Sequence, residues 1–256
     1  NTGVYAQPHK TTKMKSYLRF LSRNKLYTAI EVIGLSVSLA FVIIIGCYAW
    51  DMYTMTWSVP DHEDIYALNG PNFGEASMEM YENVDKIPEV QEYTAYNFSD
   101  IWVEHEEGMF SESMILVGKD FFDMFPMKTK AGETGKMADD GTVVISESLA
   151  KKMFGKPEEA VGKTMTFNRW GSKENPEYSN SLQVKAVIED LDNTVFLSAG
   201  VIMNLQAGER CGSPIYRPQV FVKTDGSVTR EELSEKVKEM IKDYCTEAPH
   251  YQLEYS

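Results

Sequence analysis

The stretch VIGLSVSLAFVIIIGCYAW, residues 32–50, decides the organisation of this chain. It holds nineteen residues and no charged side chain. An α-helix rises about 1.5 Å per residue, so a helix of this length crosses a hydrocarbon layer of about 30 Å. Ser36 and Ser38 can hydrogen-bond to carbonyl groups of their own helix, and membrane helices tolerate Gly34 and Gly46. The stretch therefore predicts a transmembrane helix.

Two other interpretations of this stretch are less favourable. A buried helix of a soluble domain seldom stays apolar on every face for about five turns. A cleaved signal peptide has a shorter apolar region that is followed by small residues, whereas Tyr48, Trp50 and Asp51 stand at this point of the chain.

Charge is distributed very unevenly on the two sides of residues 32–50. The net charge of the chain is −13, and the residues before 32 carry +5, which leaves −18 for residues 32–256. Because positive flanks stay in the cytoplasm, we expect a cytoplasmic N-terminus and an extracytoplasmic remainder. Aromatic side chains that would mark the outer membrane interface follow: Tyr48, Trp50, Tyr53 and Trp57.

The N-terminal residues 1–31 form the predicted cytoplasmic segment. Residues 1–13 are polar and patternless, and Met14 is a plausible natural start. Between residues 15 and 23 aromatic and leucine side chains alternate with basic ones, which is typical either of an amphipathic helix on the inner membrane surface or of a simple basic flank. Both interpretations remain open at this point.

Residues 51–256 predict one extracytoplasmic domain of the α+β class, because hairpin-like strands and short amphipathic helices are interspersed. Residues 130–141 and 171–180 are expected to be polar loops. The predicted helices are 75–86, 119–125, 146–155 and 229–244. The predicted strands are 64–70, 93–104, 109–117, 142–145, 162–170, 182–188, 199–204, 219–223 and 251–255.

No motif for bond chemistry stands out in this domain. GKPEEAVGKT, residues 155–164, has six residues between its glycines where a phosphate-binding loop has four. The four histidines have no metal-ligand spacing, and the serines of ISESLAKK lack the flanking glycines of a nucleophile elbow. We therefore expect no catalytic residue, metal or cofactor, and a membrane-anchored hydrolase is disfavoured.

The charge of the outer domain argues against one class of partner, and the cysteine content leaves the disulfide state open. A strongly acidic outer domain repels phosphate, which argues against nucleic acid as a partner and hints at cationic cargo such as antimicrobial peptides. Cys47 lies in the predicted membrane span, whereas Cys211 and Cys245 could pair in an oxidising compartment or stay free.

Several linked motifs resemble one known family. VVISESLAKKMFGKPEEAVGKTMTF (143–167) is similar to the signature of the MacB-like extracytoplasmic core domain of FtsX/MacB-type ABC transporter permeases. YLRFLSRNKLYTAIEVIGLSVSLA (17–40) resembles their first membrane segment. The runs HEDIYAL (62–68), VGKDFFDMF (117–125) and AVIEDLDNTVF (186–196) follow in the family's order, with Asp192 where the family often has proline.

The resemblance implies a permease subunit, or the N-terminal part of one, in a bacterial inner membrane. It implies a cytoplasmic ABC ATPase subunit, contact with membrane lipid, and a homodimer or pseudo-dimer with a related permease. The cargo would be peptide, lipoprotein or drug, exported or extracted. A single-span sensor or ligand-binding protein is the alternative. The family-motif residues are expected to define the fold: Ser146, Glu147, Leu149, Ala150, Lys151, Lys152, Phe154, Gly155, Val161, Gly162 and Lys163.

Overall fold

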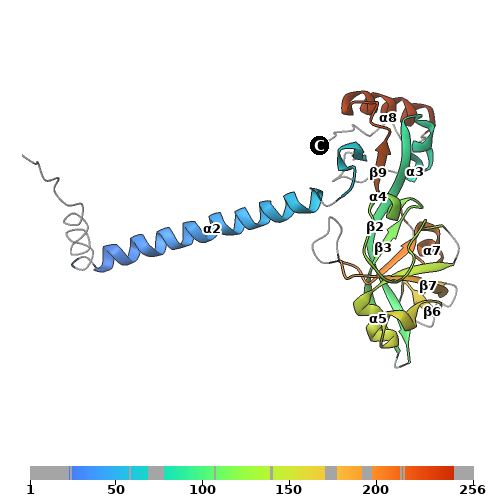
Figure 1. The fold of residues 1–256 in the computed structure, drawn as a ribbon, viewed down its shortest axis with the longest axis horizontal. Coiled ribbons are helices and arrows are strands. Elements are labelled where there is room, and N and C mark those ends of the chain that lie inside the picture. The colour runs from blue at the N-terminus through green and yellow to red at the C-terminus, as the bar shows by residue number, and fades with distance from the viewer. Residues whose placement is uncertain are drawn as a thin grey trace, which may run out of the picture. The chain divides into compact units, whose positions relative to one another are not determined.

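A computed structural model of the chain describes residues 23, 25–57, 59–68, 78–106, 108–138, 141–170, 178–191, 198–213, 215 and 217–244. The chain divides into two units, Asn1–Thr54 and Met55–Ser256. The first unit is dominated by one long helix, and the second contains all the strands that the described residues form (Figure 1).

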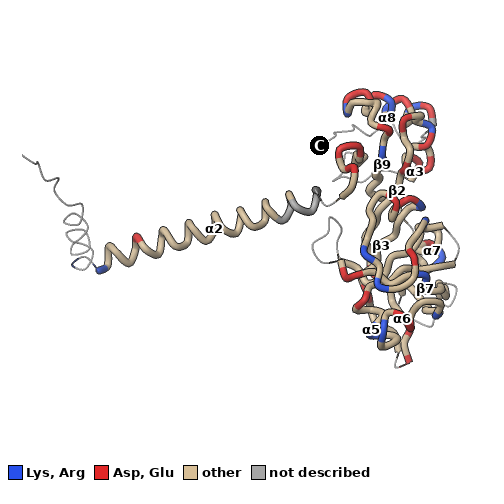
Figure 2. Tube along the Cα trace, in the orientation of Figure 1, with Lys and Arg blue, Asp and Glu red and all other residues tan. Residues whose placement is uncertain are grey.

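Helix α2, Lys25–Trp57, contains the predicted membrane span and is longer than it at both ends. Within the described residues, Lys25–Trp50 is the one helix long and apolar enough to cross a membrane, and none of it is buried by protein. Figure 2 shows α2 almost free of charged residues, whereas both signs of charge cover the strand-containing unit. Ser38 donates a 2.9 Å hydrogen bond to the carbonyl of Gly34, as expected of a serine inside an apolar helix.

Six strands of the second unit form a closed barrel. They follow one another around the ring in the order β2, β3, β8, β5, β7 and β6. The ring closes because β6 pairs with β7 on one side and with β2 on the other, where Val103 lies opposite Phe167. The strands are β2 (Val90–His105), β3 (Gly108–Val117), β5 (Thr142–Ser146), β6 (Thr164–Asn168), β7 (Asn180–Ile188) and β8 (Val201–Asn204).

Alternate residues of these strands fill the barrel. Successive side chains of a strand point to opposite faces, so each strand sends every second side chain inward. The inward side chains are apolar and buried in one cluster, which is the main hydrophobic core of the unit. They are Ile101 and Val103, Met114 and Leu116, Val201 and Met203, Val143 and Ile145, Leu182 and Val184, and Met165 and Phe167.

Helices close both ends of the barrel. Helix α5 (Glu147–Phe154) follows the C-terminal end of β5, and α7 (Leu205–Arg210) follows the C-terminal end of β8. Because β5 and β8 are antiparallel, these helices lie at opposite ends. Leu149 of α5 and Leu205 of α7 both belong to the barrel core. The short helix α6 (Pro157–Ala160) lies beside α5 and buries Ala160 in the same core.

A second, smaller sheet shares strand β2 with the barrel. Its order is β1 (Ile65–Leu68), β9 (Gln219–Thr224) and the first half of β2, all antiparallel to their neighbours. Helix α3 (Met78–Asn83), the 3₁₀ turn η2 (Val84–Lys86) and helix α8 (Arg230–Tyr244) bury its core. Figure 1 shows α3 and α8 near one end of the unit and α5 near the other, with β2 and β3 running between them.

A third cluster lies on the outside of the barrel, where it meets the small sheet. Helix α4 (Phe121–Met124) contributes Phe121 and Phe122, which pack with Ile115 and Ile202 of the barrel wall. Phe125 meets Phe221 of β9 edge to face, with ring centroids 5.3 Å apart. This contact joins the outer barrel wall to the small sheet.

The α+β class and most predicted elements are confirmed, with several corrections. Residues 130–141 are not wholly a loop, because β4 (Thr129–Gly132) pairs with β7. Residues 157–160 form α6, and β2 extends beyond the predicted 93–104 at both ends. The amphipathic segment 15–22, most of the loop 171–180 and the strand 251–255 lie outside the described residues.

Candidate functional site

The family-motif residues gather at one end of the barrel. The hydroxyl of Ser146 accepts a 3.2 Å hydrogen bond from the amide of Leu149, so Ser146 is the N-cap of α5, at the start of the predicted helix 146–155. Gly155 ends the helix with a φ of 83°, a backbone conformation that favours glycine. Leu149 and Ala150 are buried in the barrel core, and Phe154 packs against it.

The charged residues of α5 tie the helix to neighbouring strands. Glu147 lies 2.6 Å from Lys151 and 3.5 Å from Lys130 of β4, and Lys130 lies 2.9 Å from Glu189 beyond β7. The hydrogen bond from Lys151 lowers the pKa of the Glu147 carboxyl, and the charge of Lys130 adds to this effect. Lys152 lies over the ring of Phe110, 3.2 Å from its centroid.

The second half of the motif aligns β6 with β7. The amide of Gly162 donates a 2.8 Å hydrogen bond to the carbonyl of Val184, and the amide of Val184 donates one of 2.8 Å to the carbonyl of Lys163. Gly162 has a φ of 82°, which the turn into β6 requires, and Val161 beside it is partly exposed. These contacts hold the motif to the barrel and to β4, and its fold-defining role stays a prediction.

A shallow cavity of about 350 Å³ lies beside the start of α5. The carboxylate of Asp190 accepts hydrogen bonds from the amide and the hydroxyl of Ser148, at 2.9 and 2.6 Å. Burial raises the pKa of Asp190, but the hydrogen bonds from Ser148 outweigh it and lower that pKa overall. Glu112 and Lys152 also line the cavity. Among the described residues no group of three or more His, Cys, Asp or Glu is placed to hold a metal ion.

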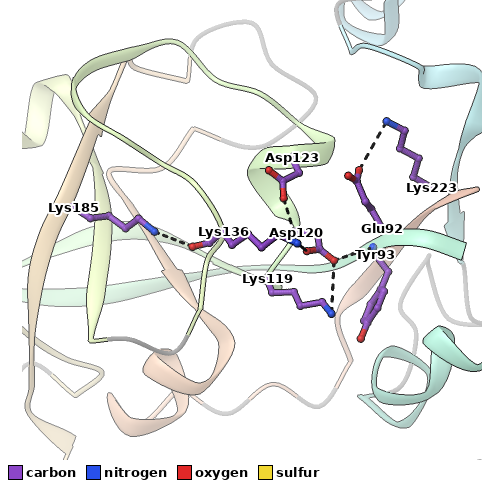
Figure 3. A network of polar contacts seen from close by, with 8 residues as sticks. All are labelled: Glu92, Tyr93, Lys119, Asp120, Asp123, Lys136, Lys185 and Lys223. Atoms are coloured by element: carbon purple, nitrogen blue, oxygen red, sulfur yellow. Dashed lines mark hydrogen bonds and ion pairs between the residues drawn. The ribbon is translucent and has the colours of Figure 1, made fainter.

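A buried carboxylate organises the junction between the barrel and the small sheet (Figure 3). Asp120, only 3% exposed, lies in the turn between β3 and α4. Its carboxylate accepts a 3.0 Å hydrogen bond from Lys136 and a 3.5 Å bond from the amide of Tyr93, and Lys119 lies 4.0 Å away. Lys136 also contacts Asp123, at 3.8 Å. The turn is thereby held to β2 at the point where β2 passes from one sheet to the other.

Tyr81 of α3 packs against the same turn. A Cβ atom placed on Gly118 would lie 2.6 Å from the Tyr81 hydroxyl and 2.8 Å from the amide nitrogen of Ala95. Only glycine fits this position without displacing its neighbours. Burial raises the pKa of Tyr81 to about 12, although a hydrogen bond with the Lys119 backbone opposes the shift.

An ion pair joins the segment that follows α2 to the small sheet. Lys223 of β9 lies 2.9 Å from Asp61 and 3.9 Å from Glu92 of β2. The hydrogen bond to Asp61 raises the pKa of Lys223. No sequence pattern predicts this contact or the one between Lys136 and Asp120, because each joins charged residues that share no motif and are separated in the chain, by 162 and 16 positions.

The cysteine pair stays a prediction. Cys211 is buried and has no disulfide partner among the described residues, and burial raises the pKa of its thiol to about 11. Cys245 lies outside the described residues.

Two of the four histidines lie in described elements of the second unit. His62 lies in η1 (His62–Asp64), and His105 at the end of β2 contacts the ring of Phe110, with ring centroids 6.4 Å apart.

Comparison with known proteins identifies the fold. The family model of the MacB-like periplasmic core domain matches residues 28–240, which include most of α2 and nearly all of the second unit. No curated protein matches the chain.

Solved structures of three related domains show the same fold. The periplasmic region of MacB from Actinobacillus actinomycetemcomitans is 19% identical with a TM-score of 0.52, over 70% of this chain and 82% of that one. A domain of a putative permease protein from Porphyromonas gingivalis is 24% identical with a TM-score of 0.52, over 73% and 83% of the two chains. The extracellular domain of the noncanonic ABC-type transporter YknZ from Gram-positive bacteria is 14% identical with a TM-score of 0.50, over 70% and 92%.

The similarity to these three solved structures shows the fold alone. The family model, in contrast, matches well over half of the chain and therefore shows the family. It also spans the motif at the end of the barrel and the junction around Asp120. The chain belongs to the MacB-like periplasmic core domain family of ABC transporter permeases.

Proposed function

We propose that this chain is the N-terminal part of a permease subunit in an ABC transporter of the MacB/FtsX type. A separate cytoplasmic ATPase subunit would drive movement of the extracytoplasmic domain, and this movement would export or extract peptide, lipoprotein or drug cargo. Family membership and the candidate membrane helix both support the proposal.

We also propose the orientation that the charge distribution predicts. The basic residues before 32 would stay in the cytoplasm of a bacterial inner membrane, and the acidic second unit would lie in the periplasm. Membrane lipid would surround α2, whose apolar side chains are exposed along its whole described length. The working unit would be a homodimer or a pseudo-dimer with a related permease.

The observation that carries the proposal is a continuous connection from the segment after α2 to the barrel. Asp61 lies four residues after the end of α2 and binds Lys223 of the small sheet. The small sheet and the barrel share the sixteen-residue strand β2, and Asp120 and Lys136 brace the point where they meet. Displacement of the α2 end would therefore move paired strands as a body, which suits a domain that transmits force.

Purification of the tagged protein from membranes of its own bacterium tests the proposal. We expect an ATP-binding subunit to copurify and the complex to hydrolyse ATP. Absence of any nucleotide-binding protein would favour the alternative, a single-span sensor without a transport role. Labelling of intact cells with a membrane-impermeant maleimide tests the orientation separately, in a variant whose three native cysteines are replaced by serine. In that background Glu235→Cys, at an exposed position of α8, should react, and Lys10→Cys should not.

A further inference from the structure

Residues 133–138 lie against the outside of the barrel between β4 and β5, and we call them the strap. None of them belongs to a described strand or helix. The strap nevertheless carries Met137, whose fully buried side chain belongs to the apolar cluster on the outer barrel wall. A segment that has no strand pairing and buries one large side chain depends on a few individual contacts for its position.

Two hydrogen bonds hold the backbone of Met137. Its amide donates a 2.8 Å bond to the carbonyl of Lys119, in the turn before α4. Its carbonyl accepts a 2.6 Å bond from the side-chain amide of Asn204, at the end of β8. Because both bonds end on Met137, we expect them to form and break together with the burial of its side chain.

Side-chain contacts of two lysines add to this attachment. Lys136 donates a 3.0 Å hydrogen bond to the buried carboxylate of Asp120 and lies 3.8 Å from Asp123. The ammonium of Lys185, in β7, donates a 2.9 Å hydrogen bond to the carbonyl of Lys136 (Figure 3). The Lys136 side chain is largely exposed, and so is the bond from Lys185, so water can replace either contact.

Opening of the strap would break far fewer contacts than unfolding of the barrel. It would expose the Met137 side chain and release the hydrogen bonds described above, but it would involve no strand pair of the barrel. Local openings of this kind have smaller free energies than global unfolding and leave the rest of the structure folded. The strap can therefore open while both sheets stay intact.

Asp120 connects the strap to β2. Its carboxylate accepts a hydrogen bond from the Tyr93 amide, at 3.5 Å, as well as the one from Lys136. A bond of this length lies at the weak end of the range for hydrogen bonds. Opening of the strap would remove Lys136 and admit water to Asp120, and this water would compete for the bond to Tyr93.

We propose that the strap opens and closes as a unit on the folded barrel, and that its closure locks the turn before α4 to β2. In the closed state Met137 is buried and Lys136 neutralises Asp120. In the open state both sheets stay folded, but the bond between Asp120 and the Tyr93 amide is weakened. The strap is thus a releasable brace at the junction of the barrel and the small sheet. The inference does not depend on the proposed transport function.

Methionine oxidation of the full chain in detergent micelles tests the opening. Hydrogen peroxide converts an accessible methionine to its sulfoxide, and mass spectrometry of peptides gives the rate at each site. Met137 should react at least about tenfold faster than Met114, which is equally buried but lies in the barrel core. The reason is that Met114 becomes accessible only when the barrel itself unfolds.

A pair of lysine variants tests what holds the strap closed. Lys136→Ala removes the bond to a buried carboxylate, so it should raise the Met137 rate about tenfold and leave the Met114 rate unchanged. Lys128→Ala is the matched control, because Lys128 is largely exposed and lies 3.9 Å from Glu189. It should change neither rate.

A third variant separates the opening of the strap from the charge next to Asp120. Lys185→Ala removes the bond to the Lys136 carbonyl but keeps the Lys136 side chain that contacts Asp120. It should raise the Met137 oxidation rate about threefold, and hydrogen exchange at the Tyr93 amide should accelerate by the same factor. The two factors should agree because one opening controls both sites.

Three outcomes would overturn the proposal. The first is equal oxidation of Met137 and Met114 in the unmodified protein, which would show that Met137 becomes accessible only by global unfolding. The second is an equal effect of Lys136→Ala and Lys128→Ala on Met137. The third is faster Met137 oxidation in Lys185→Ala without faster exchange at Tyr93, which would show that the strap does not lock β2.

Discussion

The ammonium group of Lys223 lies 2.9 Å from the carboxylate of Asp61, although 162 positions separate the two residues in the sequence. Asp61 adopts a left-handed backbone conformation, with a φ of 52°, immediately before η1. The pair therefore fixes the entry of the chain into the small sheet. About 63% of the Asp61 side chain is exposed, against 21% for Lys223, so solvent screens the interaction.

A double-mutant cycle measures the strength of this pair. Asp61→Asn and Lys223→Met, singly and together, should give a coupling free energy of about 0.5 kcal/mol in urea unfolding of the full chain. The coupling should shrink at about 1 M salt, because screening acts over about 3 Å there. A coupling that does not change with salt would contradict the electrostatic origin.

Lys223→Met also tests the proposed transmission of force. In the complex with its ATPase, the variant should lower transport or the activity coupled to it, while the protein still folds. Lys238→Met is the matched control, because within the described part of the chain Lys238 pairs only with Glu235 of its own helix. Equal activity of both variants would show that the Asp61–Lys223 pair plays no part in transmission.

Replacement of Asp120 by alanine should destabilise the junction. The variant leaves the amide of Tyr93 and the ammonium of Lys136 without their shared acceptor, and loss of a buried partner typically costs about 1–3 kcal/mol. Asp123→Ala removes a carboxylate that is 37% exposed and should cost less than about 0.5 kcal/mol. Urea unfolding of both variants measures the difference, and similar values would contradict the importance of the buried site.

Stability should fall at high pH because of Tyr81. Its pKa is about 12 in the folded protein, against an ordinary value near 10. A folded-state pKa that is raised means that the unfolded chain loses the phenol proton first, so this contribution is complete below about pH 10 and is lost as the pH rises towards 12. Tyr81→Phe should flatten the dependence of the unfolding free energy between these values. Tyr178→Phe removes a hydroxyl from an exposed ring and should leave the curve unchanged.

Substitutions in and next to α5 distinguish how much core packing and N-capping each contribute to the stability of the protein. Leu149→Ala removes a buried side chain from the barrel core and should cost about 2–5 kcal/mol. Ser146→Ala removes the N-cap hydrogen bond and should cost about 1 kcal/mol. Lys156→Ala changes an exposed residue just beyond the helix and serves as the control. Loss of transport without loss of stability in Leu149→Ala would contradict a purely fold-defining role.

Local pattern was sufficient to predict most elements of this protein. The apolar stretch 32–50, the N-cap Ser146 and the C-cap Gly155 each depend on residues within one helix, so their structure follows from nearby sequence. The strand β4 was missed because it is short, and three of its four residues are exposed in spite of its pairing with β7. Alternation could not show it, since polar and apolar side chains do not alternate in TKAG.

The amino-acid sequence alone predicted an apolar helix with basic residues before it and an acidic α+β domain after it, and it contains the family motif. These features could be predicted because periodicity, charge and capping act over a few residues. Closure of the barrel through β6, the sharing of β2 between two sheets, and the meeting of Asp61 with Lys223 and of Asp120 with Lys136 came only with the folded chain. The physical reason is that strand pairing and ion pairs depend on distance in space. Charged residues of either sign are numerous, and no local pattern specifies which of them the fold will bring together.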